Sequence, residues 1–362
     1  MTNSGYKQEL YWGDESAYGT GATINQPFGL VQSVNPTETN TLIKVRTMGG
    51  TRDYNNIVAG KFEVSGNVEY YLQGGAFIRQ AMGEDTATTT TVDSGPKIHS
   101  GASYLHVMGS AASPTADSFP SFEMEFTDEE DTGAAANTAN LKRRYRGCRV
   151  NALTISGNVD EPVKVNADWI GRHVVISTAA AAAVTQSTDD PYVFYQGAVY
   201  ATTGAISAYT AIGTSSEIAE VNSFDFSVNN NLEAVWYVSG TTATQQIKRG
   251  VKVLIPKGRD YAANLNLHFK NRAMYQKFLG ATDATIPQDT LAKYQIVLDL
   301  IRSGTLGGVK AATDDYMRIM LASCAFDTIN IPGSPEDIVN ETIGVDVKSA
   351  KIYVIDDDAS YQ

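Results

Sequence analysis

The feature that most constrains this chain is a stretch that its sequence repeats. Val58–Gly83 reads VAGKFEVSGNVEYYLQGGAFIRQAMG and Ile255–Gly280 reads IPKGRDYAANLNLHFKNRAMYQKFLG, so the two align without a gap at an offset of 197 (280 − 83). In both copies apolar and polar residues first alternate, which predicts a strand with one buried face. A segment with apolar residues on one helical face follows and closes with a glycine, as helices often do. The chain must therefore accommodate the same strand-then-helix unit twice.

Two further pairs of segments extend the repeat. Leu30–Gly50 matches Glu220–Gly240 at an offset of 190 (221 − 31), so the second copy carries seven extra residues (197 − 190) before its strand-then-helix unit. Cys148 matches Cys324 at an offset of 176 (324 − 148). Because both cysteines occupy one equivalent position, we interpret them as small buried apolar residues rather than as a redox or metal pair.

Alternating segments elsewhere complete an all-β prediction. Ser121–Phe126 (SFEMEF) alternates cleanly, and the repeat assigns its counterpart Tyr294–Leu300 (YQIVLDL) to a strand, although that pattern alone also suits a helix. A length of 362 residues is typical of two domains. We therefore predict an all-β fold with short helices, built as two tandem β-sandwich or barrel domains related by internal duplication.

Composition suggests where these domains begin and end. Residues 1–25 are polar with scattered aromatics, and we interpret them as an extended arm rather than a packed element, or as a frayed terminus. The first domain spans 26–176 and includes a low-complexity loop insertion at 84–118, with room for one strand near Tyr104–Met108. A linker at 177–216 carries one strand-like piece, Tyr192–Tyr200, and the second domain spans 217–362.

The charge balance argues against tight binding of nucleic acid. The formal net charge is −12, and the parts before and after the boundary at Ile176 each contain 14 Lys and Arg and 20 Asp and Glu. Nucleic-acid binding needs a basic surface, although an acidic surface past which DNA slides stays compatible. The N-terminus lacks the apolar core of a signal peptide, and no apolar run approaches the ~20 residues of a membrane helix. We expect a soluble chain made in the cytoplasm, with no membrane partner.

No arrangement of residues indicates catalysis. The sequence lacks phosphate-binding, dinucleotide-binding, GxSxG and HExxH motifs, its four histidines are scattered, and its two cysteines are too far apart for a metal knuckle. Glu123 and Glu125 share a strand face and are interpreted as solvated carboxylates. The acidic run Asp128–Asp131 and the basic run Lys142–Arg144 with Arg146 are interpreted as solvated loops. We predict no enzyme activity, no metal and no cofactor.

A set of strand and turn signatures, taken in order, resembles a known family. The chain reads LYWGDESAYGTGAT, GLVQSVNPTETN, VAGKFEVSGNVEYYLQ and RRYRGCRVNALTISGNVDEPVKV, and later PYVFYQGAVY, VNSFDFSVNNNLEAVW and GRDYAANLNLHFKNRAMYQKFLG. Together these resemble the tail tube (major tail) proteins of tailed viruses of bacteria and archaea. The resemblance runs from about Leu10 to Ile355, and the loop at 84–118 carries no part of it.

The resemblance implies a structural virion protein whose subunits form rings. Such rings stack into a hollow tail tube through which viral DNA passes without specific binding. Family rings are typically built from six tube domains, so a chain with two tail-tube-like domains is expected to form a trimeric, pseudo-hexameric ring. The implied partners are other copies of the chain, the tail terminator, the baseplate or initiator complex and the tape-measure protein.

If the family geometry holds, one polar strand face lines the lumen of the tube. The candidate lumen-facing residues are Glu63, Asn67, Glu69, Asp260, Asn264 and Asn266. The alternative is that this face is outer solvent surface. Loops at residues 35–40 and 229–231, or the N-terminal arm, are candidates for contacts between rings, and ordinary exposed turns explain them equally well.

Two other classes of function stay open at this point. One is a ring protein at the end of the tube, such as a terminator or a baseplate hub. The other is a tandem β-sandwich adhesin or carbohydrate-binding module, which predicts exposed aromatic platforms. Trp12, Tyr192, Tyr195 and Trp236 are the aromatics available for such platforms, and the lack of a signal peptide argues against this class.

Overall fold

The structure is a computed structural model. It describes residues 8–50, 52–85, 104–109, 119–128, 141–177, 184–204, 212, 220–237, 248–303, 315–333 and 338–356. Antiparallel strands make up almost all of its regular structure, with only short helical turns between them. The prediction of an all-β fold with short helices is confirmed.

One long antiparallel sheet runs through both halves of the chain. Its eight strands follow one another edge to edge. In spatial order they are β3 (Leu30–Val45), β4 (Asn56–Tyr71), β9 (Lys164–Gly171), β8 (Leu141–Asn158), β12 (Val221–Asn229), β15 (Asp260–His268), β18 (Asn340–Val347) and β17 (Asp315–Asn330). We call this the long sheet.

Two outer sheets branch from the long sheet, because β8 and β17 are each shared between layers. The first part of each of these strands pairs in an outer sheet, and the last part pairs in the long sheet. The first outer sheet contains β8 with β2 (Gln26–Pro27), β1 (Gln8–Asp14), β7 (Phe122–Asp128) and β10 (His173–Ile176).

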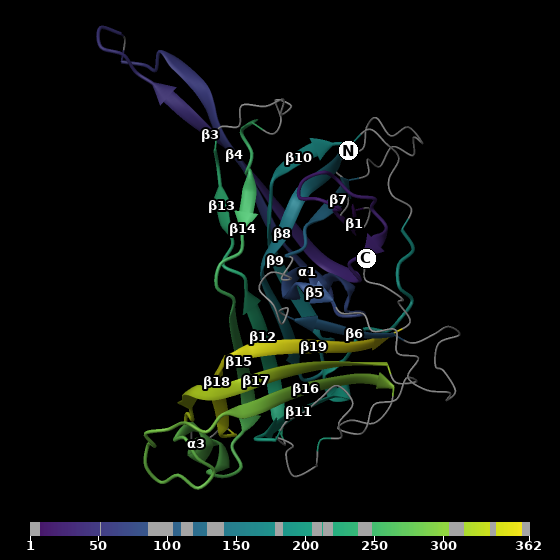
Figure 1. Ribbon diagram of the computed structural model, residues 1–362, viewed down its shortest axis with the longest axis vertical. Helices are drawn as coiled ribbons and strands as arrows, with labels where there is room; N and C mark the ends of the chain where they lie inside the picture. Colours follow the sequence, from purple (N-terminus) through teal and green to yellow (C-terminus); the bar gives the residue numbers. More distant parts are fainter. Residues whose placement is uncertain are drawn as a thin grey trace.

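The second outer sheet contains β17 with β11 (Gly197–Thr202), β16 (Tyr294–Ser303), β19 (Ser349–Asp356), β6 (Tyr104–Gly109) and β5 (Glu84–Asp85). Figure 1 shows β16, β17 and β19 crossing the lower part of the molecule, while β12 and β15 climb towards its upper part. A small hairpin of β13 (Glu233–Val235) and β14 (Val253–Ile255) continues above them.

Alternation of side chains decides which face of the long sheet is buried. On β15, Tyr261, Ala263, Leu265 and Leu267 are buried, whereas the residues between them are exposed or half-exposed. Successive side chains on a strand point to opposite faces, so one face packs on the outer sheets and the other stays polar. Buried residues from both halves of the chain form a single apolar cluster. The predicted parity of the repeated strands is confirmed.

The short helices stand where the repeat predicts them. After β4, a 3-10 turn (η2, Ala76–Ile78) leads into α1 (Arg79–Met82), and after β15 comes α3 (Ala273–Phe278). Gly83 and Gly280 follow these helices with φ of 97° and 115°. Only glycine adopts such backbone angles without strain, which explains why each repeat closes on this residue.

The N-terminal region corrects one expectation. Residues 8–14 form β1, which pairs with β7 along seven residues, so this part of the predicted arm is a packed strand. Trp12 is 0% exposed, and its ring lies 5.3 Å from that of Phe77 at an interplanar angle of 75°. Phe77 in turn lies 5.2 Å from Phe122 and 4.5 Å from Phe28, measured between ring centroids. This aromatic cluster fixes β1 and the helical turn to the core.

The charged runs are also placed differently from the prediction. The residues of the basic run belong to β8 rather than to a solvated loop: Lys142, Arg143 and Arg144 pair with β7, and Arg146 pairs with β10. Glu123 and Glu125 are both 0% exposed. Arg146 Nε donates to Glu123 Oε1 at 3.0 Å, and Arg144 Nε donates to Glu125 Oε2 at 2.6 Å. Buried carboxylates need such partners, so the interpretation of these two as solvated is wrong. Asp128 ends β7, and the rest of the acidic run lies outside the described residues.

Two segments outside the repeated units contribute strands. Within the predicted insertion at 84–118, Tyr104–Gly109 forms β6, as the apolar patch there suggested, and it pairs with β19 near the C-terminus. Within the predicted linker at 177–216, the strand-like piece includes a 3-10 turn (η3, Phe194–Gln196) followed by β11, which pairs with β16. Both strands complete the second outer sheet.

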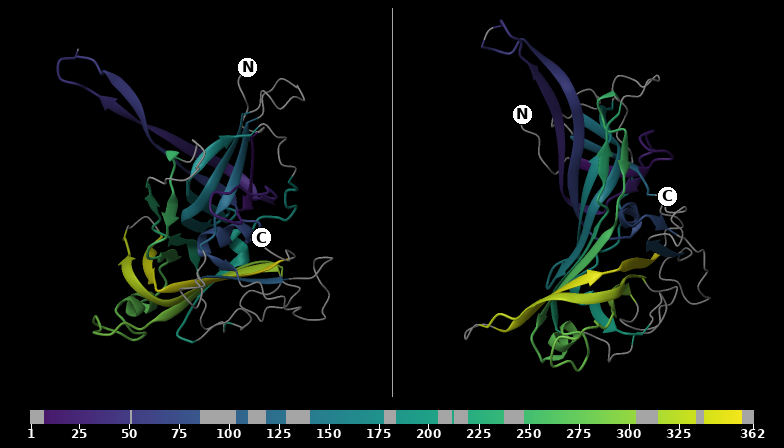
Figure 2. Two further views of the ribbon diagram at one scale, coloured as in Figure 1. Left: turned by 45° about the horizontal axis from the view of Figure 1, so that its top comes forward. Right: turned by 60° about the vertical axis from the view of Figure 1, so that its left-hand side comes forward.

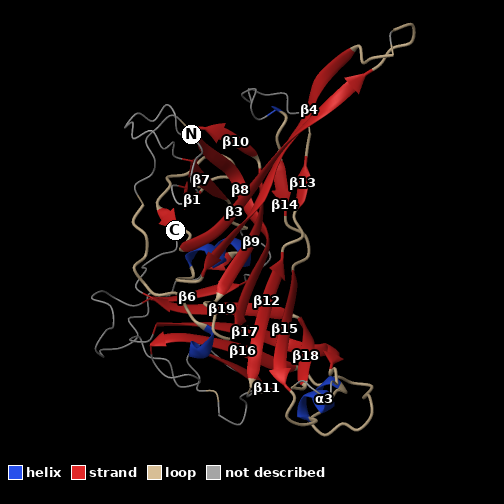
Figure 3. Cartoon of the chain, turned by 180° about the vertical axis from the view of Figure 1, so that it is seen from behind, coloured by secondary structure: helices blue, strands red, loops and turns tan. Residues whose placement is uncertain are grey.

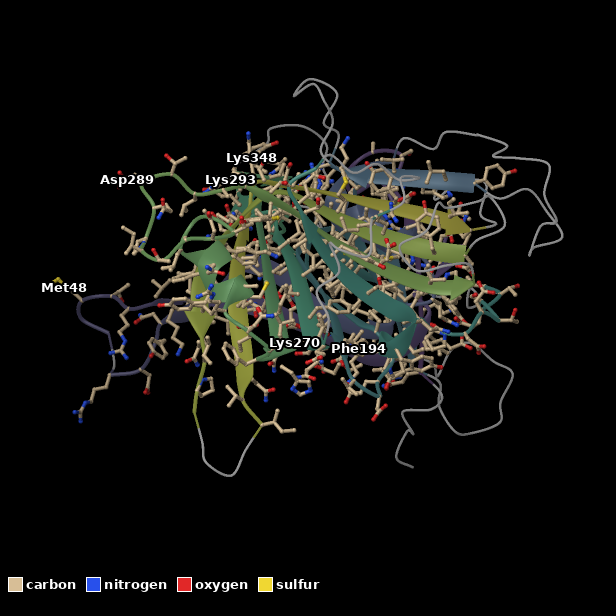
Figure 4. The ribbon with its side chains drawn as sticks, turned by 90° about the horizontal axis from the view of Figure 1, so that it is seen from below. Met48, Phe194, Lys270, Asp289, Lys293 and Lys348 are labelled. Atoms are coloured by element: carbon tan, nitrogen blue, oxygen red, sulfur yellow. The ribbon has the colours of Figure 1, made fainter. Side chains whose placement is uncertain are left out.

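A hairpin projects from the body of the molecule. β3 and β4 are 16 residues long each, and their ends at residues 42–50 and 52–58 extend beyond the other strands (Figures 1 and 2). Figure 3 shows the two strands running diagonally from the body of the molecule out to the tip. We call this the projecting hairpin. Met48, at its tip, is fully exposed and stands clear of the body (Figure 4).

Removal of the Trp12 side chain tests the role of the aromatic cluster. Because Trp12 is fully buried, we expect Trp12→Ala to lower the free energy of unfolding by about 3–5 kcal/mol. Urea unfolding followed by fluorescence and circular dichroism measures this change. Tyr195→Ala is the matched control, since Tyr195 is 75% exposed and its loss should cost less than about 0.5 kcal/mol. Equal effects of the two substitutions would contradict the packed position of β1.

Candidate functional site

The polar face of the long sheet carries all six candidate lumen residues. On β4, Glu63, Asn67 and Glu69 alternate with the buried Val64, Val68 and Tyr70, so they point away from the core. On β15, Asp260, Asn264 and Asn266 alternate with the buried Tyr261, Ala263, Leu265 and Leu267 in the same way. Because both strands bury their other face against the same core, these residues share one side of one continuous sheet.

Side-chain amides and a carboxylate form hydrogen bonds across this face. Asn67 lies between Asn35 on β3 and Asp168 on β9 in the strand register. The Nδ2 group of Asn35 donates to Asn67 Oδ1 at 3.1 Å, and the Nδ2 group of Asn67 donates to Asn166 Oδ1 at 3.4 Å. On the other half, Asp260 Oδ2 accepts from Asn231 Nδ2 at 2.7 Å. Cross-strand polar pairs of this kind stabilise an open sheet face.

Carboxylates outnumber lysines on the polar face. At the outward positions of β4, β9, β12, β15 and β18 the charged residues are Glu63, Glu69, Asp168, Asp225, Asp260 and Asp346, against Lys61 and Lys164. Partial burial raises the pKa of the Asp168 and Asp225 carboxyls above their ordinary value. The face is therefore acidic, and ionisation of Asp168 and Asp225 lowers the stability of the folded state.

Strand pairing in the second half repeats that of the first half. Phe224 lies opposite Leu265, as Val34 lies opposite Val68, at offsets of 190 (224 − 34) and 197 (265 − 68). The pairing of β15 with β18 is equivalent to that of β4 with β9. Likewise, the pairing of β17 with β16 is equivalent to that of β8 with β7. The register shift between Val221 and Ser223 has its counterpart between Val31 and Ser33. Register and irregularities thus coincide across the two halves.

One seam joins the two halves within the chain. β8, from the first half, pairs with β12, from the second half, along seven residues of each strand. Leu153 and Ile155 on β8 are 0% exposed, as are Phe226 and Val228 on β12. We call this the internal seam. It makes the long sheet continuous and buries apolar side chains from both halves along one line.

The two ends of the long sheet are open edges. Among the described residues, β3 pairs only with β4, and the last part of β17 pairs only with β18. Along the β17 edge, Ile329 and Ile331 are half-exposed, and along the β3 edge so are Val34 and Pro36. An unpaired strand edge is a ready template for pairing with another chain.

The loops proposed from the sequence for contacts between rings are not free loops. Residues 35–40 lie within β3 and pair with β4. Asn230 is 1% exposed, and its Nδ2 group donates to the carbonyl oxygens of Ala81 and Val150, each at 3.0 Å. Arg259 Nε donates to Asn230 Oδ1 at 2.7 Å. Asn230 is a structural residue that ties the start of the second half to the first helical turn.

The projecting hairpin is the exposed apolar feature that the sequence analysis did not single out. Its exposed side chains include Leu42, Ile43, Val45, Met48, Tyr54, Ile57 and Val58. Three basic residues, Lys44, Arg46 and Arg52, stand among them, with Asp53 as the one acidic residue at residues 42–50 and 52–58. Its strands carry apolar residues on both faces, and yet these residues lie outside the core. This combination identifies the hairpin.

The aromatics available for a carbohydrate-binding platform do not form one. Trp12 and Tyr192 are 0% exposed. Trp236 is covered by Lys61, whose Nζ lies 4.0 Å from the ring centroid. Tyr195 is 75% exposed, but a single exposed ring is not a platform. This finding weakens the adhesin alternative.

The described part of the chain has neither a candidate metal cluster nor a candidate membrane-spanning helix. No group of three or more His, Cys, Asp or Glu side chains there is arranged to hold a metal ion. Cys148 and Cys324 are both buried and unpaired as disulfides, in agreement with their interpretation as core residues. Within the same residues, no helix has the length and apolar character to cross a membrane.

The raised pKa values of Asp168 and Asp225 predict a pH-dependent stability. A raised pKa in the folded state means that folding favours the protonated carboxyl, so stability falls as pH rises from about 4 through the folded-state value. We expect the melting temperature of Asp168→Asn/Asp225→Asn to exceed that of the unmodified chain at pH 7, and the gap to close near pH 3. Differential scanning calorimetry across this range measures it. Asp289→Asn, in an exposed loop, is the control and should show no such trend.

Comparison with known proteins supports the resemblance noted from the sequence. The family model described as "Phage tail tube protein" matches residues 5–347 of the chain. None of the curated proteins compared with the chain matches it. The matched region includes the long sheet, both helical units and most of both outer sheets. The chain belongs to the phage tail tube protein family, a family of structural proteins of the viral tail.

Proposed function

We propose that three copies of this chain form a pseudo-hexameric ring and that such rings stack into the tail tube. Each chain supplies two tail-tube-like domains, 26–176 with the N-terminal strand β1, and 217–362 with β11. The observation that carries the proposal is the internal seam. One half already joins the next edge to edge, and the two open edges of the long sheet stand where the same joint would continue.

The open edges make a closed ring the natural form of assembly. A repeated heterologous contact closes into a ring when the rotation per unit allows it, and closure leaves no edge strand to aggregate. Three chains with eight long-sheet strands each would form a barrel roughly 50 Å across its backbone, from strands ~4.8 Å apart and tilted by ~40°. Such a barrel leaves room for a DNA duplex.

The acidic polar face suits the inner wall of this barrel. Glu63, Asn67, Glu69, Asp260, Asn264 and Asn266 would line the lumen, together with Asp168 and Asp225. Carboxylates repel the phosphate backbone, and amides offer weak, sequence-independent contacts. Nucleic-acid affinity depends on basic groups that displace counterions, so a wall of this kind lets DNA pass without holding it.

The projecting hairpin suits contacts between successive rings. A two-stranded hairpin is at best marginally stable alone in water, and exposed apolar patches mark interaction sites. Its basic residues complement a chain whose net charge is −12. The occupant we propose is the next ring of the same protein. At the two ends of the tube, the terminator, the baseplate or initiator complex and the tape-measure protein are the expected partners.

Electron microscopy and mass measurement test the ring. We expect purified protein to give rings or tubes with six similar lobes and, in solution, particles with three times the mass of one chain. Rings of six chains would contradict the pseudo-hexamer but keep the tube. Isolated rings that never stack would favour the alternative of a terminator or hub protein at the end of the tube.

Charge reversal tests the lumen. We expect Glu63→Lys/Asp260→Lys to leave the tubes intact but to impair DNA ejection, because lysines on the inner wall would bind the phosphate backbone. Ejection from assembled particles is followed by fluorescence of a DNA-binding dye. Asp283→Lys/Asp289→Lys carries the same charge change on the exposed loop that follows α3 and should eject normally. Normal ejection from the Glu63→Lys/Asp260→Lys particles would contradict the lumen assignment.

A further inference from the structure

The internal seam specifies the contact between subunits residue by residue. We propose that β3 of one copy pairs antiparallel with the end of β17 of the neighbouring copy, with Thr37 opposite Asn330, Glu38 opposite Ile329 and Thr39 opposite Thr328. We call this the outer seam. This inference rests on the proposed ring, and it adds the strands, the direction and the register of the joint.

The register follows from the pairing within the chain. At the internal seam, Ser227 lies opposite Thr154. Shifting Ser227 by 190 gives Thr37, and shifting Thr154 by 176 gives Asn330. An offset of 190 relates β3 to β12, and an offset of 176 relates β8 to β17. At these offsets, residues that pair in the first half correspond to residues that pair in the second half. The same shifts place Pro36 opposite Ile331 and Val34 opposite Gly333.

Burial indicates that these edges have no partner among the described residues. Leu153 and Ile155 are 0% exposed at the internal seam, whereas their counterparts Ile329 and Ile331 are half-exposed. A Cβ placed on Gly157 would lie 2.6 Å from the Phe224 ring, but one placed on its counterpart Gly333 meets nothing within 4 Å. The space that a neighbouring strand fills at the internal seam is therefore open at the end of β17.

Backbone hydrogen bonds show that the proposed register tolerates its prolines. At the internal seam, Asn230 N donates to Asn151 O at 2.7 Å and Val159 N donates to Asn222 O at 3.2 Å. Antiparallel pairs alternate between hydrogen-bonded and non-hydrogen-bonded, so Phe226–Ile155 is a hydrogen-bonded pair and Ser227–Thr154 is not.

By the same alternation, Pro36 occupies a hydrogen-bonded position of the outer seam, and Pro332 does not. The outer seam then loses one donor, that of Pro36. Proline is tolerated in strands where its missing N–H faces an edge, as it does here. One absent bond leaves the rest of the ladder intact, so the register stays feasible.

The outer seam differs in chemistry from the internal seam. Glu38 stands where the internal seam has Val228, and Pro36 stands where it has Phe226. Glu38 is held on its own subunit, because Tyr145 Oη donates to Glu38 Oε1 at 3.1 Å and Arg143 lies 3.8 Å from the same oxygen. The outer seam thus buries less apolar surface, and it is the joint at which a ring is expected to open first.

Engineered disulfides test the register. Opposite residues of a non-hydrogen-bonded pair have Cα atoms about 4.5 Å apart, which suits a disulfide. We expect Thr37→Cys/Asn330→Cys to give covalent dimers and closed trimers on non-reducing gels after mild oxidation of assembled rings. Both positions are exposed in one subunit, so the variant should fold.

Three controls accompany this variant. The unmodified chain should stay uncross-linked, since Cys148 and Cys324 are buried. Ser227→Cys/Thr154→Cys should form a bond within one chain, because these residues are opposite at the internal seam. Thr37→Cys/Thr328→Cys moves the pairing by two residues on the same face, to a distance of about 7–8 Å, and should cross-link several-fold less.

The outcomes separate the seam from the ring. If Thr37→Cys/Asn330→Cys forms rings but stays monomeric on the gel, the proposed register is wrong, whereas the proposed tail-tube function still stands. Preferential cross-linking of Thr37→Cys/Thr328→Cys would overturn it in favour of a shifted one. The absence of rings and tubes from the unmodified protein would overturn the proposed function and the seam together.

Discussion

Every sheet must satisfy the N–H and C=O groups of its edge strands, and this requirement organises the molecule. Six of the eight long-sheet strands have partners on both sides within the chain, and β6 covers the edge of β19 in the second outer sheet. Only the edges at β3 and at the end of β17 have no partner on one side of the long sheet in the described residues. In the ring proposed above, these two edges pair with another copy, because an open strand edge otherwise invites uncontrolled pairing.

Charged residues have different roles in the second outer sheet and on the polar face of the long sheet. Within the second outer sheet, on the face away from the main apolar cluster, Arg318 donates to both oxygens of Asp299, at 2.7 and 2.9 Å, with both residues 0% exposed. A buried charge is tolerated only with such a partner, so this pair fixes one arrangement of β16 and β17. On the polar face of the long sheet, the carboxylates are exposed or half-exposed, and Asp260 accepts a hydrogen bond from Asn231 Nδ2 at 2.7 Å. A surface of this second kind repels DNA, whereas the first kind holds the subunit together.

The sequence predicts the parts of this fold that depend on periodicity. Alternation and the repeat identified β4, β15, β7 and β16, the helical turns and the glycines after them, and the polar parity of residues such as Asn67 and Asn264. Burial of Glu123 and Glu125 was not predictable in this way, because a carboxylate in a strand is ordinarily solvated and its arginine partners lie on another strand. β1 was missed because its burial depends on Phe77 and Phe122, which are distant in sequence. The open edges required the pairing order, which no local pattern contains.

In the proposed ring, the presence of two tail-tube-like domains in one chain makes the internal seam and the outer seam form under different conditions. Within the chain, the tether raises the effective concentration of one half near the other, so the internal seam forms on folding and can be fully apolar, with Phe226 and Val228 at its centre. Such a strip would be a liability on the edge of a free subunit, since it would favour pairing with any exposed strand. Pro36 and Glu38 at the equivalent positions of β3 remove a donor and add a charge, which keeps the free edge selective. Under the proposed assembly, the difference between these two pairs of residues would let the chain fold as one unit and still form a ring.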